Sequence, residues 1–193
     1  MVTEFIKNNW DGCIRYSPKD EETLIGMPYP YIVPSVDERL QEMYYWDTFF
    51  ACKGLVLSGR TEIAKNCTDD MLYMVNRFGF MPNGNRTYYL TQSQPPFLSM
   101  MVKDVYEAYN DKEWLKTAYE TLKKEYHFWM TERITQIGLN TFKVNKENIT
   151  GEDKHYESIC RRISYKVPMD DYIDMDEVSD RISRVFGIAA YSR

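Results

Sequence analysis

The feature that most constrains this chain is a set of apolar side chains that recur every three or four residues along much of its length. Residues 63–78 carry apolar positions at steps of four, four, three and four, and Gly79 follows. Residues 97–109 and 115–129 repeat the pattern, with charged side chains between the apolar ones. Apolar residues at this spacing lie on one face of an α-helix. The sequence therefore predicts successive amphipathic helices.

Six helices are expected in all. Asp111 is suited to cap the N-terminus of the fourth, and Pro95 and Pro96 are suited to the first turn of the third. The expected helices cover about 42–59, 63–78, 94–109, 111–133, 154–164 and the residues from 176 onward. No pair of alternating strands is joined by a tight turn signal, which favours an all-α fold over an α/β fold. A bundle or solenoid of helix pairs and a closed barrel of helical hairpins both fit this order.

Residues 1–40 differ from the rest of the chain in composition. They are rich in proline, tyrosine and charge, and Pro28, Pro30 and Pro34 argue against a helix in that stretch. We therefore expect a lead-in segment over residues 1–40, followed by a helical domain over residues 41–193.

Charge and hydropathy exclude several classes of partner. The formal charge is −5, from 29 acidic and 24 basic residues with no basic block, so nucleic acid is not an expected partner. No apolar run approaches the ~18 residues of a membrane span, and no signal-like stretch opens the chain, so we expect a cytoplasmic protein without a membrane partner.

The cysteines lack metal-ligand spacing and are expected to be reduced, and no metal or other cofactor is expected. These are Cys13, Cys52, Cys67 and Cys160.

The connection over residues 79–94 is long for a link between two helices, and such links are often functional. Tyr88 and Tyr89 supply flat faces suited to the apolar side of a sugar ring. Five further side chains offer groups that bond to hydroxyls: Asn83, Asn85, Arg86, Gln92 and Gln94. The alternative is an ordered loop whose asparagines form turns and whose amides cap helices.

A second cluster, over residues 39–50, places polar groups among aromatic ones. Trp46 and Asp47 fall on one side of the helix expected there, and a tryptophan next to a carboxylate in a cleft suits a sugar. The alternative is an aromatic core helix in which Arg39 and Asp47 form structural ion pairs.

Both clusters resemble motifs of one family. Residues 39–49 read Arg-Leu-x-Glu-x-Tyr-x-Trp-Asp-x-Phe, which resembles the first trehalase signature, although the usual Pro-Gly-Gly before it is absent. Residues 82–90 read Pro-Asn-Gly-Asn-Arg-Thr-Tyr-Tyr-Leu, and Ser-Gln-Pro-Pro follows at 93–96, as in that family's conserved loop. Over about residues 30–165 the chain is similar to trehalases of glycoside hydrolase family 37.

This resemblance implies an (α/α)6 barrel, of which the chain would form about half of the helical hairpins, and an inverting glycosidase acting on an α-glucoside such as trehalose. Gln92 stands where the family has an arginine, and it retains hydrogen bonding without the charge. Glu157 belongs to His-Tyr-Glu-Ser, where the family has Arg-Pro-Glu-Ser. The implied sugar-binding residues are Arg39, Trp46, Asp47, Asn83, Gln92, Gln94 and Glu157.

The catalytic residues are expected to lie outside this chain. Inverting hydrolysis needs a carboxylic acid and a carboxylate base. The acid of trehalases belongs to a Gly-Trp-Asp motif, and none follows Glu157 here. We expect the N-terminal part of a trehalase-like glycosidase, with an apolar barrel edge that could drive self-association. The alternatives are a non-catalytic sugar-binding module or truncated remnant, and a helical interaction protein.

Overall fold

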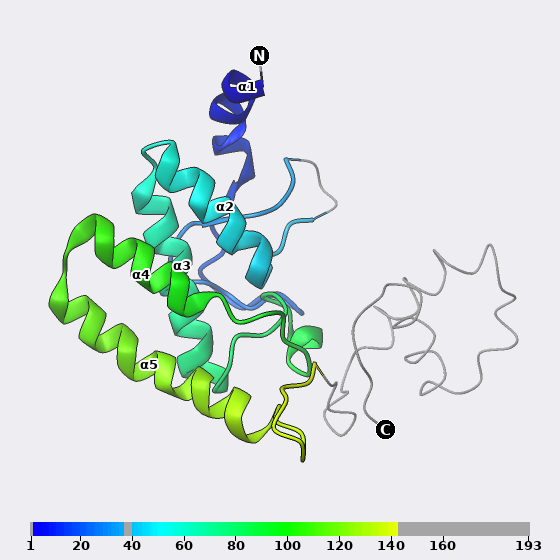
Figure 1. The fold of residues 1–193 in the computed structure, drawn as a ribbon. Coiled ribbons are helices and arrows are strands. Elements are labelled where there is room, and N and C mark those ends of the chain that lie inside the picture. The colour runs from blue at the N-terminus through cyan, green and yellow to red at the C-terminus, as the bar shows by residue number, and fades with distance from the viewer. Residues whose placement is uncertain (1, 37–39, 143–193) are drawn as a thin grey trace, which may run out of the picture.

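A computed structural model describes residues 2–36 and 40–142, and five α-helices form the scaffold of this part (Figure 1). They are α1 (Val2–Asn9), α2 (Tyr45–Leu57), α3 (Thr61–Phe78), α4 (Leu98–Tyr109) and α5 (Lys112–Thr131). Two single turns of 3-10 helix, η1 (Asp11–Cys13) and η2 (Thr87–Tyr89), lie in the connections. The helices expected at 154–164 and from 176 lie outside the described residues, as do Arg39, Glu157 and Cys160.

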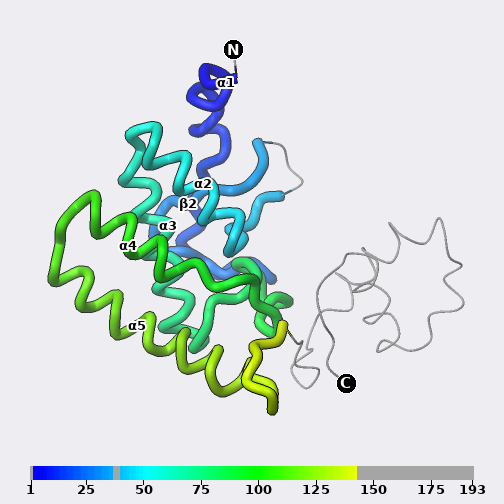
Figure 2. Tube along the Cα trace, in the orientation of Figure 1, coloured from blue at the N-terminus to red at the C-terminus, as the bar shows by residue number. Residues whose placement is uncertain are grey.

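Helix α3 lies at the centre of this scaffold. It packs against α2, α4 and α5, and α4 also packs against α5 (Figure 2). Asn110, in the left-handed conformation with φ of 52°, joins α4 to α5 in a tight helical hairpin. Short links between successive helices thus build a layered helical structure, and the expected all-α fold is confirmed.

Local sequence explains where the helices begin and end. Helix α3 ends at Gly79, whose φ of 85° suits glycine, and the Asp111 carboxylate accepts the Trp114 N–H at the start of α5, as expected of a cap. Helix α4 begins at Leu98 instead of Gln94. Gln94 and Pro95 each precede a proline, and a residue before proline is disfavoured in helical conformation.

The first 36 residues contain more secondary structure than expected. Besides α1, they form an antiparallel pair of two-residue strands, β1 (Ile14–Arg15) and β2 (Tyr31–Ile32). Strands this short leave no visible alternation in the sequence, so the pattern predicts no strand there. The segment also contributes buried side chains to the core, namely Ile25, Met27, Tyr31, Ile32 and Val33. It therefore packs on the helices, with β2 against α3.

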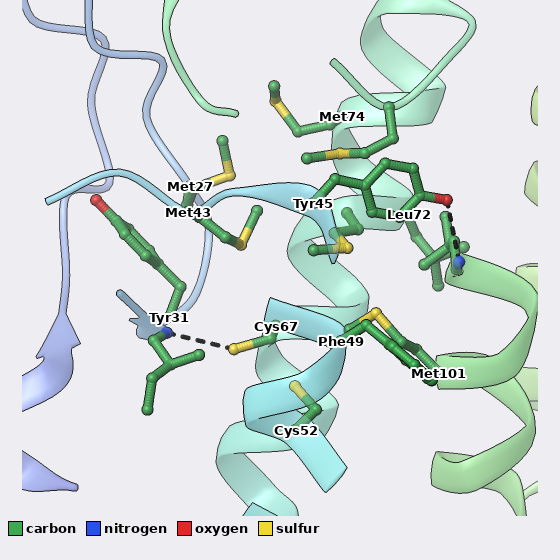
Figure 3. Close-up of a cluster of buried hydrophobic side chains, with 14 of the residues drawn as sticks. Met27, Tyr31, Met43, Tyr45, Phe49, Cys52, Cys67, Leu72, Met74 and Met101 are labelled. Atoms are coloured by element: carbon green, nitrogen blue, oxygen red, sulfur yellow. Dashed lines mark hydrogen bonds between the residues drawn. The ribbon is translucent and has the colours of Figure 1, made fainter. Parts of the chain in front are cut away.

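The core between the strands, α2 and α3 is rich in methionine and aromatic side chains (Figure 3). Met27 and Met43 enter it from outside the helices, whereas Met74 and Met101 come from α3 and α4. Flexible thioethers fill irregular spaces between elements that meet at different angles. The core is thus shared by residues far apart in the sequence.

The three cysteines of the described part, Cys13, Cys52 and Cys67, are free thiols. Cys52 of α2 and Cys67 of α3 are buried side by side in the core (Figure 3), and the hydrogen bond to Cys67 together with burial raises the pKa of the Cys52 thiol. Within residues 2–36 and 40–142, no three metal-ligating side chains gather at one place. None of the helices there is long and apolar enough to span a membrane.

Asp70 makes the stability of this core depend on pH. It is fully buried, one carboxylate oxygen accepts the Tyr29 N–H at 3.0 Å, and the other has no partner among the described residues. Burial raises the pKa of Asp70 to about 8, so the folded protein keeps a proton that the unfolded chain loses near pH 4. The free energy of unfolding should therefore fall between about pH 4 and 8, by at most ~1.4 kcal/mol per pH unit from this group.

Asp70→Asn should remove that part of the slope and raise the free energy of unfolding near pH 8. Urea denaturation of both proteins at about pH 5.5 and about pH 8 measures the difference. Asp20→Asn is the matched control, because Arg77 lowers the pKa of Asp20 to about 2 and neutralising it should stabilise nothing. An Asp70→Asn variant with the slope of the wild type would show that Asp70 is ionised in the fold.

Candidate functional site

The two clusters singled out in the sequence meet at the N-terminus of α2. The carbonyl of Asn83 accepts the Tyr45 N–H at 3.1 Å, and Tyr44 and Gly84 form an isolated antiparallel bridge. A Cβ on Gly84 would lie 3.3 Å from the carbonyl oxygen of Met43 and 3.2 Å from the ring of Tyr89. The loop over residues 79–94 can therefore approach the start of α2 this closely because residue 84 is glycine.

Gln94 connects the end of this loop to the first turn of α2. Its side-chain oxygen accepts the Trp46 N–H at 2.9 Å. The first N–H groups of a helix have no partner within the helix, so this bond satisfies one of them. Tyr44 is extended, with ψ of 146°, and the helix consequently begins at Tyr45 and not near residue 42.

Trp46 and Asp47 lie side by side in that first turn. Trp46 is 43% exposed and its ring packs against that of Phe50, with the ring centres 6.3 Å apart. Asp47 is half-buried and forms no ion pair with a described residue, while burial raises the pKa of its carboxyl group. An accessible aromatic ring and a carboxylate without an ion pair to a described residue thus share one end of the helix.

Asn83 and Gln92 face each other across the loop. The Asn83 N–H donates to the carbonyl of Gln92 at 2.9 Å, and the Gln92 N–H donates to the carbonyl of Tyr89 at 3.0 Å. Both side chains are partly exposed. The structure therefore brings together five of the predicted sugar-binding residues: Trp46, Asp47, Asn83, Gln92 and Gln94.

Two other polar residues of the loop bond within the fold, and the full burial of Asn85 contradicts the interpretation that its amide grips sugar hydroxyls. Asn85 is fully buried, its oxygen accepts the Met43 N–H at 2.8 Å, and its amide donates to the carbonyl of Ile25 at 3.2 Å. Arg86 forms an ion pair with the buried Glu42, with N–O distances of 2.8 and 2.9 Å. For Asn85 the alternative of an ordered, hydrogen-bonded loop is correct.

The tyrosines of the loop belong to an aromatic cluster. Tyr89 packs edge-on against Tyr44, with centres 5.9 Å apart, and Tyr88 packs against Tyr89 at 4.7 Å. The Tyr44 hydroxyl donates to Glu42 at 3.0 Å. Burial raises the pKa of all three hydroxyls, so they remain protonated hydrogen-bond donors in the physiological range.

A buried pair beneath the site was missed. The Tyr45 hydroxyl donates to Glu125 of α5 at 2.6 Å and accepts the Leu98 N–H of α4 at 3.0 Å. Burial raises the pKa of Glu125 to about 7. The signal was present, because Glu125 interrupts the apolar face of α5 three residues after Leu122. This pair links α2 to the helices that follow.

A shallow hollow of about 520 Å³ lies elsewhere, between Gly79 and α5. Its lining includes Lys123 and His127, and none of the predicted sugar-binding residues contributes to it. The chemistry of the start of α2 therefore makes it the stronger candidate site.

The two loop asparagines give a matched test. Asn85→Ala should leave the Met43 N–H and the Ile25 carbonyl buried without partners and lower the free energy of unfolding by about 2–4 kcal/mol. Asn83→Ala should change it by less than about 0.5 kcal/mol, because no described residue bonds to the Asn83 side chain. Denaturant unfolding of both variants measures the contrast. An equal fall in the free energy of unfolding in both variants would contradict the assignment of a structural role to Asn85 and not to Asn83.

Comparisons with known proteins find trehalases. The family model described as Trehalase matches residues 3–183. A periplasmic trehalase of Xanthomonas campestris pv. campestris strain B100 is 44% identical over 132 residues, which is 67% of this chain and 22% of that protein. A trehalase of Apis mellifera is 41% identical over 115 residues, which is 60% of this chain and 18% of that protein.

The fold is also similar to a solved one. A neutral trehalase from Saccharomyces cerevisiae matches 98% of this chain and 36% of its own, with a TM-score of 0.58 and 25% identity. The expected fold class, an all-α chain forming part of a trehalase-type helical toroid, is thereby confirmed. The chain spans about a fifth of the length of the curated relatives named above. Because the family model matches nearly the whole sequence, the chain belongs to the trehalase family.

Proposed function

We propose that this chain supplies sugar-binding residues to a glycoside hydrolase that acts on trehalose or a related α-glucoside. The observation that carries the proposal is the exposed Trp46 ring beside the half-buried Asp47 carboxylate, which forms no ion pair with a described residue, at the N-terminus of α2. Family membership supports the reaction class, and the names of the relatives support trehalose as the substrate.

Each residue of the proposed site has a distinct task. The Trp46 ring packs against the apolar face of a glucose unit, and Asp47 accepts hydrogen bonds from its hydroxyls. Amides both donate and accept, so Asn83, Gln92 and Gln94 complete the contacts to neighbouring hydroxyls. Helix α2 and the loop over residues 79–94 hold these groups before sugar arrives, which lowers the entropic cost of binding.

The same geometry supports a division between binding and catalysis. Glu42 is engaged by Arg86 and by the Tyr44 hydroxyl, which leaves Asp47 as the unpaired carboxylate among the described residues of the site. Inversion requires two carboxyl groups about 6.5–9.5 Å apart. We therefore propose that the acid and the base are supplied from outside this chain.

By itself the chain would act as a sugar-binding module. Family membership gives no support to the other alternative, a general helical interaction protein.

Substitutions in the first turn of α2 test the binding role. Trp46→Ala and Asp47→Asn should each weaken trehalose binding by about 1–3 kcal/mol, with melting temperatures close to that of the wild type. Titration calorimetry and thermal melts on the same samples measure both quantities. Asp104→Asn is the control, because Asp104 forms an ion pair with Lys53 away from the loop. A large drop in melting temperature with Asp47→Asn would indicate a structural carboxylate instead.

The purified chain should not hydrolyse trehalose at an enzymatic rate. Loss of a general acid or base costs about 10²–10⁴-fold in rate, and we propose that both are absent. Glucose release measured with a coupled assay checks this, and a full-length trehalase serves as the positive control. Turnover near that of the positive control would show that the chain carries its own acid and base.

A further inference from the structure

Arg133 is a buried cation that forms no ion pair within the described residues, although the charge of the neighbouring Glu132 acts on it. The residue is 2% exposed, and none of the ion pairs there includes it. Buried charges are normally paired, because removing a charge from water is costly. One guanidinium nitrogen, Nη1, is also buried without a hydrogen bond. A methionine would fill a similar volume at lower cost, so the guanidinium requires a specific explanation.

The surroundings of Arg133 hold its side chain in one place. The guanidinium lies over the Phe128 ring, 4.8 Å from its centre, and Phe128 stacks on Phe80. The Arg133 N–H donates to the carbonyl of Phe128, and its carbonyl accepts the Thr141 N–H at 2.7 Å. The residue follows the C-terminus of α5, where helix carbonyls favour a positive charge.

From this position Arg133 reaches the site loop. Its Nη2 donates to the carbonyl of Thr91 at 3.2 Å, and Thr91 is itself buried. The residues that follow Thr91 make the bonds already described: the Gln92 carbonyl accepts the Asn83 N–H, and the Gln94 side chain accepts the Trp46 N–H. The stretch over residues 91–94, the return limb of the loop, is thus fixed at one end by Arg133 and at the other by α2.

We propose that Arg133 is a positioning residue for the sugar site, which it serves by holding the Thr91 carbonyl so that Gln92 and Gln94 are presented beside Trp46. The inference rests on the proposed function for its effect on sugar, but the placement of the return limb does not depend on sugar. A guanidinium suits this task, because its planar fork keeps a fixed direction toward the carbonyl. A lysine would retain the charge and lose that direction.

Hydrogen exchange measured residue by residue tests the placement directly. In Arg133→Met, the Gln92 and Trp46 amides should exchange about tenfold faster relative to the Val75 amide of α3, which reports on the core. Arg133→Lys should give an intermediate increase. Arg60→Met is the matched control, because Arg60 pairs with Asp11 outside the site. It should leave the ratio of limb to core exchange unchanged.

Trehalose titration of the same variants supplies the second measurement, and we expect Arg133→Met to bind roughly fivefold to tenfold more weakly. Exchange that accelerates equally at Gln92, Trp46 and Val75 would make Arg133 a general stabiliser and overturn the proposal. Unchanged exchange at the limb would overturn it as well. Selective exchange in a chain that binds no trehalose would support the positioning of the limb and refute the proposed function, so the two ideas fail separately.

Discussion

The described structure depends on hydrogen bonds between the loop over residues 79–94 and the extended residues that precede α2. The Asn85 side chain bonds to the Met43 N–H and to the Ile25 carbonyl. The Asn83 carbonyl accepts the Tyr45 N–H, and the side-chain oxygen of Gln94 accepts the Trp46 N–H in the first turn of α2. Each bond satisfies a backbone group that would otherwise lack a partner, because neither segment belongs to a regular ladder at that point. The start of α2 is consequently set by a loop some 40 residues away.

Polar groups in the interior tie this junction to the rest of the helices. Tyr45 reaches Glu125 and Leu98, so α2 is joined to α5 and to the start of α4, and Arg133 reaches Thr91 from beyond the end of α5. Such contacts are directional, unlike the packing of the methionine-rich core, whose flexible side chains tolerate small shifts. We infer that apolar burial stabilises the helical layers while the buried polar contacts determine the orientation of the site.

Sequence reasoning predicted the candidate site residues but did not foresee that some polar side chains of the same loop bond within the fold. Trp46 and Asp47 were predicted from two residue types suited to sugar. The structure leaves the Trp46 ring accessible and gives Asp47 no ion pair with a described residue. Asn85 and Arg86 were suited to sugar on the same grounds of residue type. In the structure, their side chains bond to Met43 and Glu42. An amide that can bind a hydroxyl can equally bind a backbone carbonyl, so residue type alone does not separate the two uses.

What the sequence by itself determined was the order of the helices from 45 to 131 and their ends at Gly79 and Asp111, since periodicity, capping and left-handed glycine act within a few residues. Only the tertiary structure decided which polar side chains are buried and bonded within the fold. The short strands at 14–15 and 31–32, the Tyr45–Glu125 pair and the contact of Arg133 with Thr91 join residues 16 to 80 positions apart. Such pairings depend on how the helices pack, and no local pattern records that packing.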